Sequence, residues 1–169
     1  MKNVHSTLNK LDAIFFDFDG VLTNNLVLVS EDGKESVFCN RSDGLGFDAL
    51  RKVGIKYFII SSEKNSIVEA RAKKIRAEVF YGVKDKKTQI LDLVKQRNFN
   101  LENCVYVGND VNDLNSLKLF GHSFCPNDGH ELVKKNVDII LKTNGGNGVV
   151  RELLEEHLSI SCYEVLYGE

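Results

Sequence analysis

Short apolar runs alternate along this chain with segments of helical periodicity, and this alternation restricts the fold more than any other feature. The apolar runs lie at 13–16, 56–60, 79–81, 105–107 and 137–141. Between and after them, apolar residues recur at helical spacing at 45–53, 65–76, 85–97, 110–120 and 147–157. Strands that alternate with helices of this length build βαβ units. The sequence therefore predicts an α/β fold with a doubly wound, Rossmann-like parallel sheet.

One segment departs from this alternation, directly after the first apolar run. Leu26–Ser30 and Glu35–Cys39 are rich in strand-forming residues and flank Asp32-Gly33. That pair favours the positive φ angles of a tight turn, so we expect a β-hairpin insertion after the first strand. An isolated hairpin is marginally stable in water. Its apolar side chains therefore need a surface to pack against, which is either the chain's own core or a second subunit.

Composition bounds the class of protein. The chain has 169 residues, 43% of them hydrophobic, and a net charge of -2, which suits one domain over 1–169 with no nucleic-acid or membrane partner. Its four cysteines form no C-x-x-C pair, which favours reduced thiols. Met1–Asp12 has no apolar signal-peptide region, and no run approaches the ~20 residues that span a bilayer. We expect a cytoplasmic protein.

Two carboxylates follow the first apolar run, in Asp17-Phe18-Asp19-Gly20-Val21-Leu22-Thr23. Carboxylates two residues apart repel each other unless a cation lies beside them. Carboxylate and backbone carbonyl oxygens are the ligands that Mg²⁺ prefers. One carboxylate can then attack phosphorus while the other protonates the leaving oxygen and later activates water. A turn or capping pair explains a bare D-x-D, but the extended motif after an apolar strand favours a catalytic, Mg²⁺-binding site.

Three further strand or helix ends carry polar groups of the same kind. Ser61 follows an apolar run and can bond a phosphate oxygen, although serine is also a frequent helix N-cap. Lys84, Lys86 and Lys87 begin a predicted helix, where a cation opposes the helix dipole and at least one needs an anionic partner. Gly108–Asp113 places two carboxylates and two amides at a helix start. Gathered at one sheet edge, these groups meet the needs of phosphoryl transfer.

Together these motifs resemble the haloacid dehalogenase (HAD) superfamily. Within it, the chain resembles the small capless phosphatases that act on 3-deoxy-D-manno-octulosonate (KDO) 8-phosphate and on KDN or N-acylneuraminate 9-phosphate. The likeness runs from Leu11 to about Glu156. It rests on Asp17-x-Asp19-Gly20-Val21-x-Thr23, Arg41-Ser42-Asp43-Gly44-Leu45-Gly46, Ser61, Lys86, Gly108-Asn109-Asp110-x-x-Asp113 and Gly145-Gly146-Asn147-Gly148-Val149-Val150-Arg151-Glu152.

The resemblance implies a role for each matching position. Asp17 would be the nucleophile and a metal ligand, and Asp19 the acid/base with its backbone carbonyl on Mg²⁺. Ser61 and Lys86 would hold the phosphate. Further metal ligands are expected among Asn109, Asp110 and Asp113, and substrate contacts among Thr23, Arg41, Asp43, Gly44, Ser62, Glu63 and Lys74.

The resemblance also implies an architecture. No cap domain is expected. The hairpin would mediate a homotetramer in which neighbouring subunits complete each other's active sites, and Gly145–Gly148 would reach into that site.

Two departures from the family pattern bear on activity. Asn109 stands where the family has aspartate, so we expect weaker metal binding unless Asp110 or Asp113 compensates. Glu63 stands where the KDO 8-phosphate enzymes tend to have arginine, and with Lys74 on the same predicted helix it resembles the KDN 9-phosphate type. A solvated helix surface is the alternative for this pair. The expected substrate is therefore a KDN or N-acylneuraminate 9-phosphate, with KDO 8-phosphate as the alternative.

Two other classes of function share some of these residues with a phosphatase. A phosphorylation-switched receiver domain also combines acidic residues, a hydroxyl and a lysine, but its phosphorylated aspartate would follow the third strand, where this chain has Gly82-Val83. A weakly active or non-catalytic oligomerisation domain associated with CMP-sialic acid synthesis finds its support in Asn109 alone.

Overall fold

A six-stranded parallel sheet forms the centre of the computed structural model, which describes residues 11–168. Most of Met1–Asp12, where we expect no signal peptide, lies outside the described residues. The strands are β1 (Ala13–Phe16), β4 (Lys56–Ile60), β5 (Glu78–Phe80), β6 (Cys104–Val107), β7 (His122–Cys125) and β8 (Ile139–Ile140). Their order in the sheet is β5-β4-β1-β6-β7-β8. The chain thus winds outward from β1 in one direction and then in the other, which confirms the doubly wound fold.

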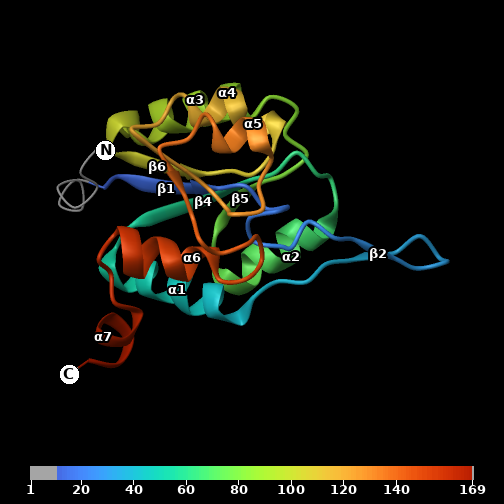
Figure 1. Cartoon of the computed structure of the whole chain (residues 1–169), viewed down its shortest axis with the longest axis horizontal. Helices are drawn as coiled ribbons and strands as arrows, with labels where there is room; N and C mark the ends of the chain where they lie inside the picture. Colours follow the sequence, from blue (N-terminus) through green and yellow to red (C-terminus); the bar gives the residue numbers. More distant parts are fainter. Residues whose placement is uncertain (1–10, 169) are drawn as a thin grey trace.

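Helices cover both faces of this sheet (Figure 1). One face carries α3 (Lys86–Arg97), α4 (Leu114–Leu117) and α5 (Glu131–Lys134), and the other carries α1 (Arg41–Val53), α2 (Ser66–Ile75) and α6 (Val149–Glu152). A π-helical turn (Leu153–His157) continues α6, and α7 (Cys162–Tyr167) contacts α1. Two 3₁₀ turns span Leu101–Asn103 and Val111–Asp113. None of the helices within residues 11–168 is long and apolar enough to cross a membrane.

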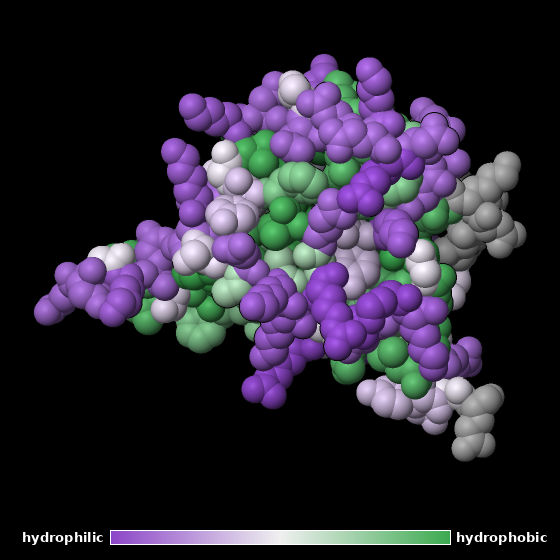
Figure 2. Space-filling view, turned by 180° about the vertical axis from the view of Figure 1, so that it is seen from behind, coloured by the Kyte–Doolittle hydropathy of each residue, from purple (hydrophilic) through white to green (hydrophobic). Residues whose placement is uncertain are grey.

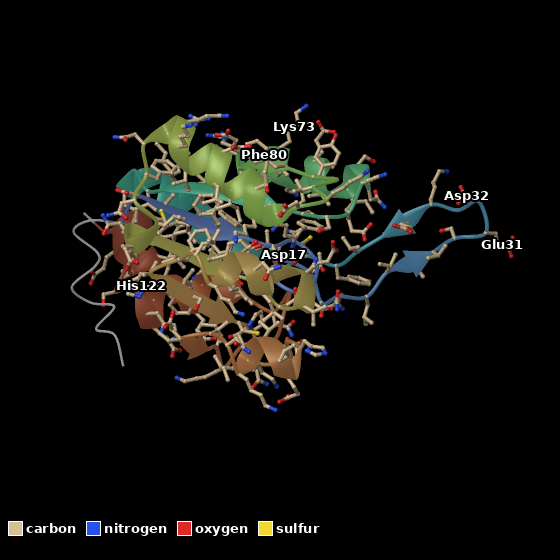
Figure 3. The ribbon with its side chains drawn as sticks, turned by 90° about the horizontal axis from the view of Figure 1, so that it is seen from above. Asp17, Glu31, Asp32, Lys73, Phe80 and His122 are labelled. Atoms are coloured by element: carbon tan, nitrogen blue, oxygen red, sulfur yellow. The ribbon has the colours of Figure 1, made fainter. Side chains whose placement is uncertain are left out.

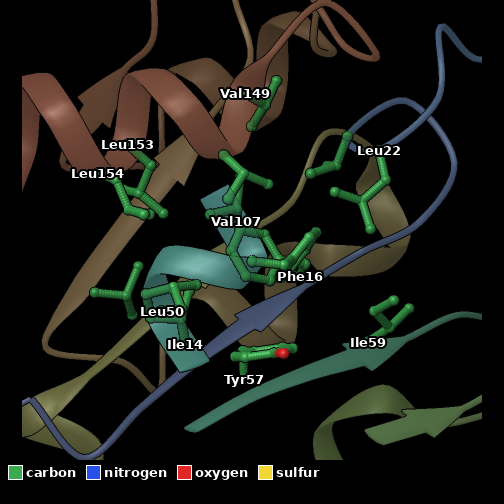
Figure 4. Packing of buried hydrophobic residues seen from close by; sticks show 14 of the residues in the cluster. Ile14, Phe16, Leu22, Leu50, Tyr57, Ile59, Val107, Val149, Leu153 and Leu154 are labelled. Carbon is green, nitrogen blue, oxygen red and sulfur yellow. The ribbon is translucent and has the colours of Figure 1, made fainter. Parts of the chain in front are cut away.

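The core lies on both sides of the strands because successive side chains of a strand point to opposite faces. Ile14 and Phe16 pack into the cluster under α1 and α6, which Figure 4 shows from close by. Ala13 and Phe15 pack into the cluster under α3 and α4. All of β1 is fully buried, which explains why it reads as an unbroken apolar run rather than an alternating one.

Strand β7 is missing from the sequence-based prediction. Two polar residues, His122 and Ser123, open this strand and hide its apolar character. Both are nevertheless buried. The Ser123 hydroxyl and N–H both donate to the Asp138 carboxylate, at 2.7 and 2.9 Å, and this bonding satisfies the polar side chain inside the sheet.

Helix boundaries differ from the prediction where capping decides them. Helix α1 begins at Arg41 rather than at Leu45, because Asn40 Oδ1 accepts the Ser42 N–H at 2.8 Å and caps it. The helix expected over 110–120 is instead a 3₁₀ turn followed by the short α4. There Asp110 and Asp113 form a capping box that closes a tight turn at its start.

The predicted hairpin is present but shorter. Strands β2 (Leu28–Val29) and β3 (Glu35–Ser36) pair antiparallel. The Gly33 N–H donates to the Ser30 carbonyl at 2.9 Å, and only Gly33 in this loop has a positive φ, of 77°. The connection is therefore a three-residue loop rather than an Asp-Gly pair with both residues at positive φ.

The hairpin projects from the body of the molecule (Figures 1 and 2). Leu26 is 66% exposed and Phe38 is 71% exposed, while Val37 at its base packs against the core. Most of its apolar side chains thus find no partner in the chain's own core.

Asp43 ties α1 to α6. Its carboxylate is 1% exposed, and its Oδ1 accepts the Val150 N–H at 2.9 Å. Its Oδ2 has no hydrogen-bond partner among the described residues. Burial raises the pKa of Asp43 from 3.8 to about 6, because the N–H groups of Val150 and Arg151 offset only part of the desolvation. This carboxylate therefore caps a helix of its own chain, and its expected contact with substrate is corrected to a structural role.

The raised pKa of Asp43 predicts a pH-dependent stability. Between about pH 4 and pH 6 the folded state holds more protons on this group than the unfolded state, so its contribution is greatest at low pH and is lost as pH rises through 6. The ionised form costs the folded state about 3 kcal/mol at neutral pH. Asp43→Asn should remove a fall of this size between about pH 4 and pH 7, as measured by urea unfolding.

Asp92→Asn, a change at an exposed aspartate on α3, is the matched control and should keep the fall seen in the wild type. If Asp43→Asn shows the same fall as the wild type, Asp43 does not titrate in this range.

Candidate active site

A pocket of about 230 Å³ opens where the carboxyl ends of β1, β4 and β6 meet. Figure 3 shows Asp17 at this end of the sheet, on the side of the hairpin, and His122 at the opposite end. The loops after these strands supply the lining: Asp17, Asp19, Asn25, Ser61, Ser62, Glu63, Asn109, Asp110, Val111 and Asn112. The structure thus brings together residues from three of the predicted strand ends.

A buried lysine connects the first and fourth motifs. The Lys86 ammonium lies 2.8 Å from Asp17 Oδ1 and 2.8 Å from Asp113 Oδ1, and all three side chains are almost fully buried. The Tyr106 hydroxyl also donates to Asp113 Oδ1, at 2.8 Å. Of the three lysines near this helix start, Lys86 is therefore the one with the anionic partners that the sequence requires.

These buried charges perturb one another. Burial raises the pKa of Asp17 and repulsion from Asp113 adds to it, while Lys86 acts in the opposite direction. Burial alone would lower the pKa of Lys86, but Asp17 and Asp113 together outweigh it and raise the pKa. The lysine therefore stays charged, and Asp17 is a carboxylate that a further cation in the pocket would help to ionise.

Asp19 lies in a different environment from Asp17. Its side chain is only partly buried and faces the pocket. Burial raises the pKa of Asp19, and the nearby Glu63 carboxylate adds to this effect. Two carboxyls in different environments suit a nucleophile and a general acid.

Thr23 supports the loop after β1 rather than the substrate. Its Oγ1 accepts the N–H groups of Gly20 and Asn25 at 3.2 and 3.3 Å, and the residue is 1% exposed. The expected substrate contact of Thr23 is therefore corrected to a structural role.

Ser61 reaches the pocket from the end of β4. Its N–H donates to the Phe80 carbonyl at 2.8 Å, and its Oγ accepts the Glu63 N–H at 3.1 Å. This geometry leaves the hydroxyl hydrogen of Ser61 to bond a phosphate oxygen. Ser62 and Glu63 lie at the exposed rim of the same pocket. Glu63 precedes α2, which Asn65 caps. Contrary to the prediction, Glu63 therefore does not share a helix with Lys74.

The fourth motif contributes Asn109 to the pocket wall. Asn109 is 6% exposed, and its Oδ1 has no hydrogen-bond partner among the described residues. The side chain lies against Gly20, where a Cβ atom would stand 1.9 Å from Asn109 Nδ2. An orphaned buried oxygen beside two aspartates fits the donor set of a Mg²⁺ site.

The other two expected metal ligands, Asp110 and Asp113, lie in different environments. Asp113 is fully buried, is already engaged by Lys86, Tyr106 and the Asn109 N–H, and does not line the pocket, so its expected role as a metal ligand stays a prediction. Asp110 caps the 3₁₀ turn through a 2.7 Å bond from the Val111 N–H and lines the pocket. Within residues 11–168, no group of three His, Cys, Asp or Glu side chains could hold a metal. The donor set therefore suits an ion that keeps water and phosphate oxygens as ligands.

Three expected substrate residues lie elsewhere. Arg41, Gly44 and Lys74 line a separate depression of about 220 Å³ between α1 and α2, together with Leu45, Asp48, Arg71 and Ile75. Within one chain they do not reach the Asp17 pocket, so a contact with its substrate requires a second subunit.

Sequence reasoning missed a second depression of about 210 Å³ beside the first. The two share Asp19, Asn25 and Glu63. Phe18, Val27, Glu35, Val37, Asn65, Ile67 and Val68 complete the lining of the second. Glu35 is fixed there by a 2.6 Å bond from Asn65 Nδ2. Only the docking of the hairpin base beside α2 brings these residues to the site, and no local motif marks them.

The arrangement can support in-line phosphoryl transfer. It offers a buried carboxylate, a second carboxyl with a raised pKa and a hydroxyl donor around one pocket, with the Lys86 ammonium fixed against the first carboxylate. These are the positioned charges and donors that the reaction needs.

Comparison with known proteins gives a consistent picture. The family model for haloacid dehalogenase-like hydrolases matches residues 49–153. The 3-deoxy-D-manno-octulosonate 8-phosphate phosphatase of Haemophilus influenzae is 31% identical over 147 residues, covering 86% of this chain and 82% of that protein. The enzyme of the same name from Escherichia coli K12 is 29% identical over 143 residues, with 84% and 76% covered.

Solved structures agree. The 3-deoxy-D-manno-octulosonate 8-phosphate phosphatase of Moraxella catarrhalis, in complex with magnesium ion, phosphate ion and KDO, superposes with a TM-score of 0.88 at 29% identity, covering 96% of this chain and 94% of that one. The cobalt-bound phosphatase of Haemophilus influenzae gives a TM-score of 0.85 at 30% identity, with 91% of each chain covered. The chain therefore belongs to the haloacid dehalogenase-like hydrolase family, as one of its capless phosphomonoester hydrolases.

Proposed function

We propose that this protein hydrolyses a sugar-acid phosphate, with KDO 8-phosphate as the substrate, through a phospho-aspartyl intermediate on Asp17. The observation that carries the proposal is the buried Asp17 carboxylate, 2.8 Å from the Lys86 ammonium and beside Asp19 and Ser61 in one pocket. The choice of KDO 8-phosphate is supported by the names of the relatives.

Each step has a residue of this chain to perform it. The phosphate enters with its oxygens held by Lys86 and the Ser61 hydroxyl. Asp17 attacks phosphorus while Asp19, whose raised pKa favours the protonated form, gives its proton to the leaving sugar oxygen. Asp19, now ionised, then takes a proton from a water molecule whose oxygen attacks phosphorus, and the P–O bond to Asp17 breaks to release phosphate and the free Asp17 carboxylate.

The pocket also fits a metal cofactor. The Asp17 carboxylate, the Asp19 carbonyl and Asn109 Oδ1 would hold Mg²⁺, with Asp110 near enough at the pocket wall to assist. When bound, the ion would offset the negative charge that gathers on the phosphoryl oxygens. Because Asn109 carries no charge, the site has one carboxylate fewer than it would have with an aspartate at this position.

A KDN or N-acylneuraminate 9-phosphate is the second candidate substrate. The observation that favours it is Glu63, a carboxylate at the rim of both depressions where the KDO 8-phosphate enzymes tend to have a cation. Comparing kcat/KM for the two classes of substrate decides between them.

The first experiment measures phosphate release from KDO 8-phosphate in the presence of Mg²⁺. We expect turnover by the wild type, and a loss of about 10⁴-fold or more in Asp17→Asn, because an amide cannot act as the nucleophile. Asp92→Asn, at the exposed aspartate on α3, should retain full activity.

Three outcomes would contradict parts of the proposal. Retained activity in Asp17→Asn excludes the phospho-aspartyl mechanism. A higher kcat/KM for the nine-carbon 9-phosphates reassigns the substrate class. Absence of turnover with every substrate, in a protein that remains folded, favours a non-catalytic oligomerisation domain.

Asn109→Asp tests the metal ligand. The added charge should lower the Mg²⁺ concentration needed for half-maximal activity by about tenfold, because ligand charge strengthens binding of a hard cation. Asn112→Asp adds the same charge at the exposed rim of the pocket and should change this concentration far less. An unchanged Mg²⁺ requirement in Asn109→Asp removes Asn109 from the set of ligands.

We further propose a homotetramer of single-domain chains in the cytoplasm. The projecting hairpin supports the assembly, since its apolar side chains are exposed in one chain. Arg41, Gly44 and Lys74 would then reach a neighbour's pocket from their separate depression. The four free cysteines, three of them buried, are consistent with a reducing compartment.

Replacing both Leu28 and Phe38 on the hairpin with serine should dissociate the tetramer, because the assembly loses apolar contact area while each chain loses almost none. Light scattering after size-exclusion chromatography measures the mass. Leu132→Ser, at an apolar side chain on α5 that is 47% exposed, should leave the mass unchanged. A tetramer that survives the hairpin changes contradicts this interface.

A further inference from the structure

The segment 143–146, ahead of α6, lies against the loop that carries the two catalytic aspartates. The Gly146 N–H donates to the Val21 carbonyl at 3.0 Å. A Cβ atom at Gly145 would stand 2.2 Å from the Gly20 carbonyl oxygen, so the two backbones touch. In Figure 1 this orange-red segment runs beside the blue chain that follows β1. The glycines are thus needed for a close approach of backbone to backbone within one chain.

The other side of the same segment is fastened to the turn after β7. The Gly145 N–H donates to Asp128 Oδ1 at 2.8 Å. The Asn127 N–H donates to the Thr143 carbonyl at 3.0 Å, and Asn127 Nδ2 donates to Asn144 Oδ1 at 3.0 Å. Of these three bonds, the one that Asp128 accepts is donated by Gly145, the glycine that touches the loop of Asp17 and Asp19.

The turn after β7 also holds the fourth motif. The His130 N–H donates to the Asn109 carbonyl at 2.8 Å. The Asn109 side chain in turn lies against Gly20. Residues 20–21, 143–146, 126–130 and Asn109 therefore form a closed ring, which we call the Asp128 ring.

We propose that Asp128 is a positioning residue that couples the two loops of the metal site. The ring contacts the carbonyls of Gly20 and Val21, directly after the Asp19 carbonyl that is one expected ligand, and it holds this loop relative to the Asn109 side chain, which is another. A charged acceptor strengthens the hydrogen bond that joins the ring's two halves. The inference rests on the proposed function, because it takes the Mg²⁺ site of Asp17, Asp19 and Asn109 as given.

Binding of Mn²⁺, followed by electron paramagnetic resonance in the absence of substrate, tests the role of Asp128 directly. Partners that orient metal ligands typically contribute about 10- to 100-fold to affinity. Asp128 acts through one further contact and is solvent-exposed, so Asp128→Ala should weaken Mn²⁺ binding about three- to tenfold. Asp128→Asn keeps an acceptor oxygen and should restore most of the affinity. Activity assays of Asp128→Ala should show the loss at saturating substrate, in kcat rather than in KM.

Asp138→Ala is the matched control. Asp138 is also an exposed aspartate that accepts a backbone N–H, from Ser123 at 2.9 Å, but it lies at the amino end of β7, away from the site. It should bind Mn²⁺ as the wild type does. If Asp128→Ala binds Mn²⁺ with the affinity of the wild type, the inference is overturned. It is also overturned if Asp138→Ala loses as much Mn²⁺ affinity as Asp128→Ala does. A wild type that binds no Mn²⁺ counts against the proposed metal site itself.

Amide hydrogen exchange of the wild type tests the same coupling without any variant. If the ring couples the two loops, Mn²⁺ should slow amide hydrogen exchange at Gly145, Gly146 and His130, although none of these is an expected metal ligand. Slowing confined to the loops of Asp17 and Asn109 would contradict the coupling.

Discussion

The ammonium of Lys86 is the interaction on which the rest of the site depends. It lies at the start of α3 yet contacts Asp17 from β1 and Asp113 from the turn after β6, each at 2.8 Å. Without this cation, two buried carboxylates would face each other across the sheet edge, and breaking such a buried pair typically costs about 3–5 kcal/mol. The ion pair therefore fixes the position of Asp17, the proposed nucleophile, and joins segments that follow β1 and β6 to the start of α3.

Gly20, Gly145 and Asn109 add further contacts to the loop that carries Asp17 and Asp19. Gly20 allows the Asn109 side chain to lie directly on the catalytic loop, and Gly145 allows a second segment to approach that loop from another side. The outcome is a pair of aspartates held by contacts from three directions. Such fixed positions are what phosphoryl transfer requires, because the protein's contribution is largely the placement of charge. The depression beside the pocket extends toward the hairpin and leaves room for the rest of a substrate.

Much of the fold could be predicted because buried strands read as apolar runs and helices as periodic ones. The β1 strand and the end of α1 at Val53 are local features, and both are where the sequence places them. Strand β7 could not be predicted, since its buried Ser123 is satisfied by Asp138, which lies 15 residues further along the chain. The partners of Asp113 also come from other parts of the chain. Its sequence motif predicts a metal ligand, but in the folded chain Lys86 and Tyr106 donate to its carboxylate.

By itself the sequence determined the chemistry of this protein: two aspartates after a buried strand, a serine, a lysine and a polar turn at other strand ends. The physical reason is that side-chain type and strand periodicity are local properties. Only the tertiary structure decided which of these groups share a pocket and which serve as support. Burial depends on residues distant in sequence, and so do partners such as Val150, whose N–H donates to Asp43. The same burial leaves Asn109 Oδ1 without a hydrogen-bond partner among the described residues.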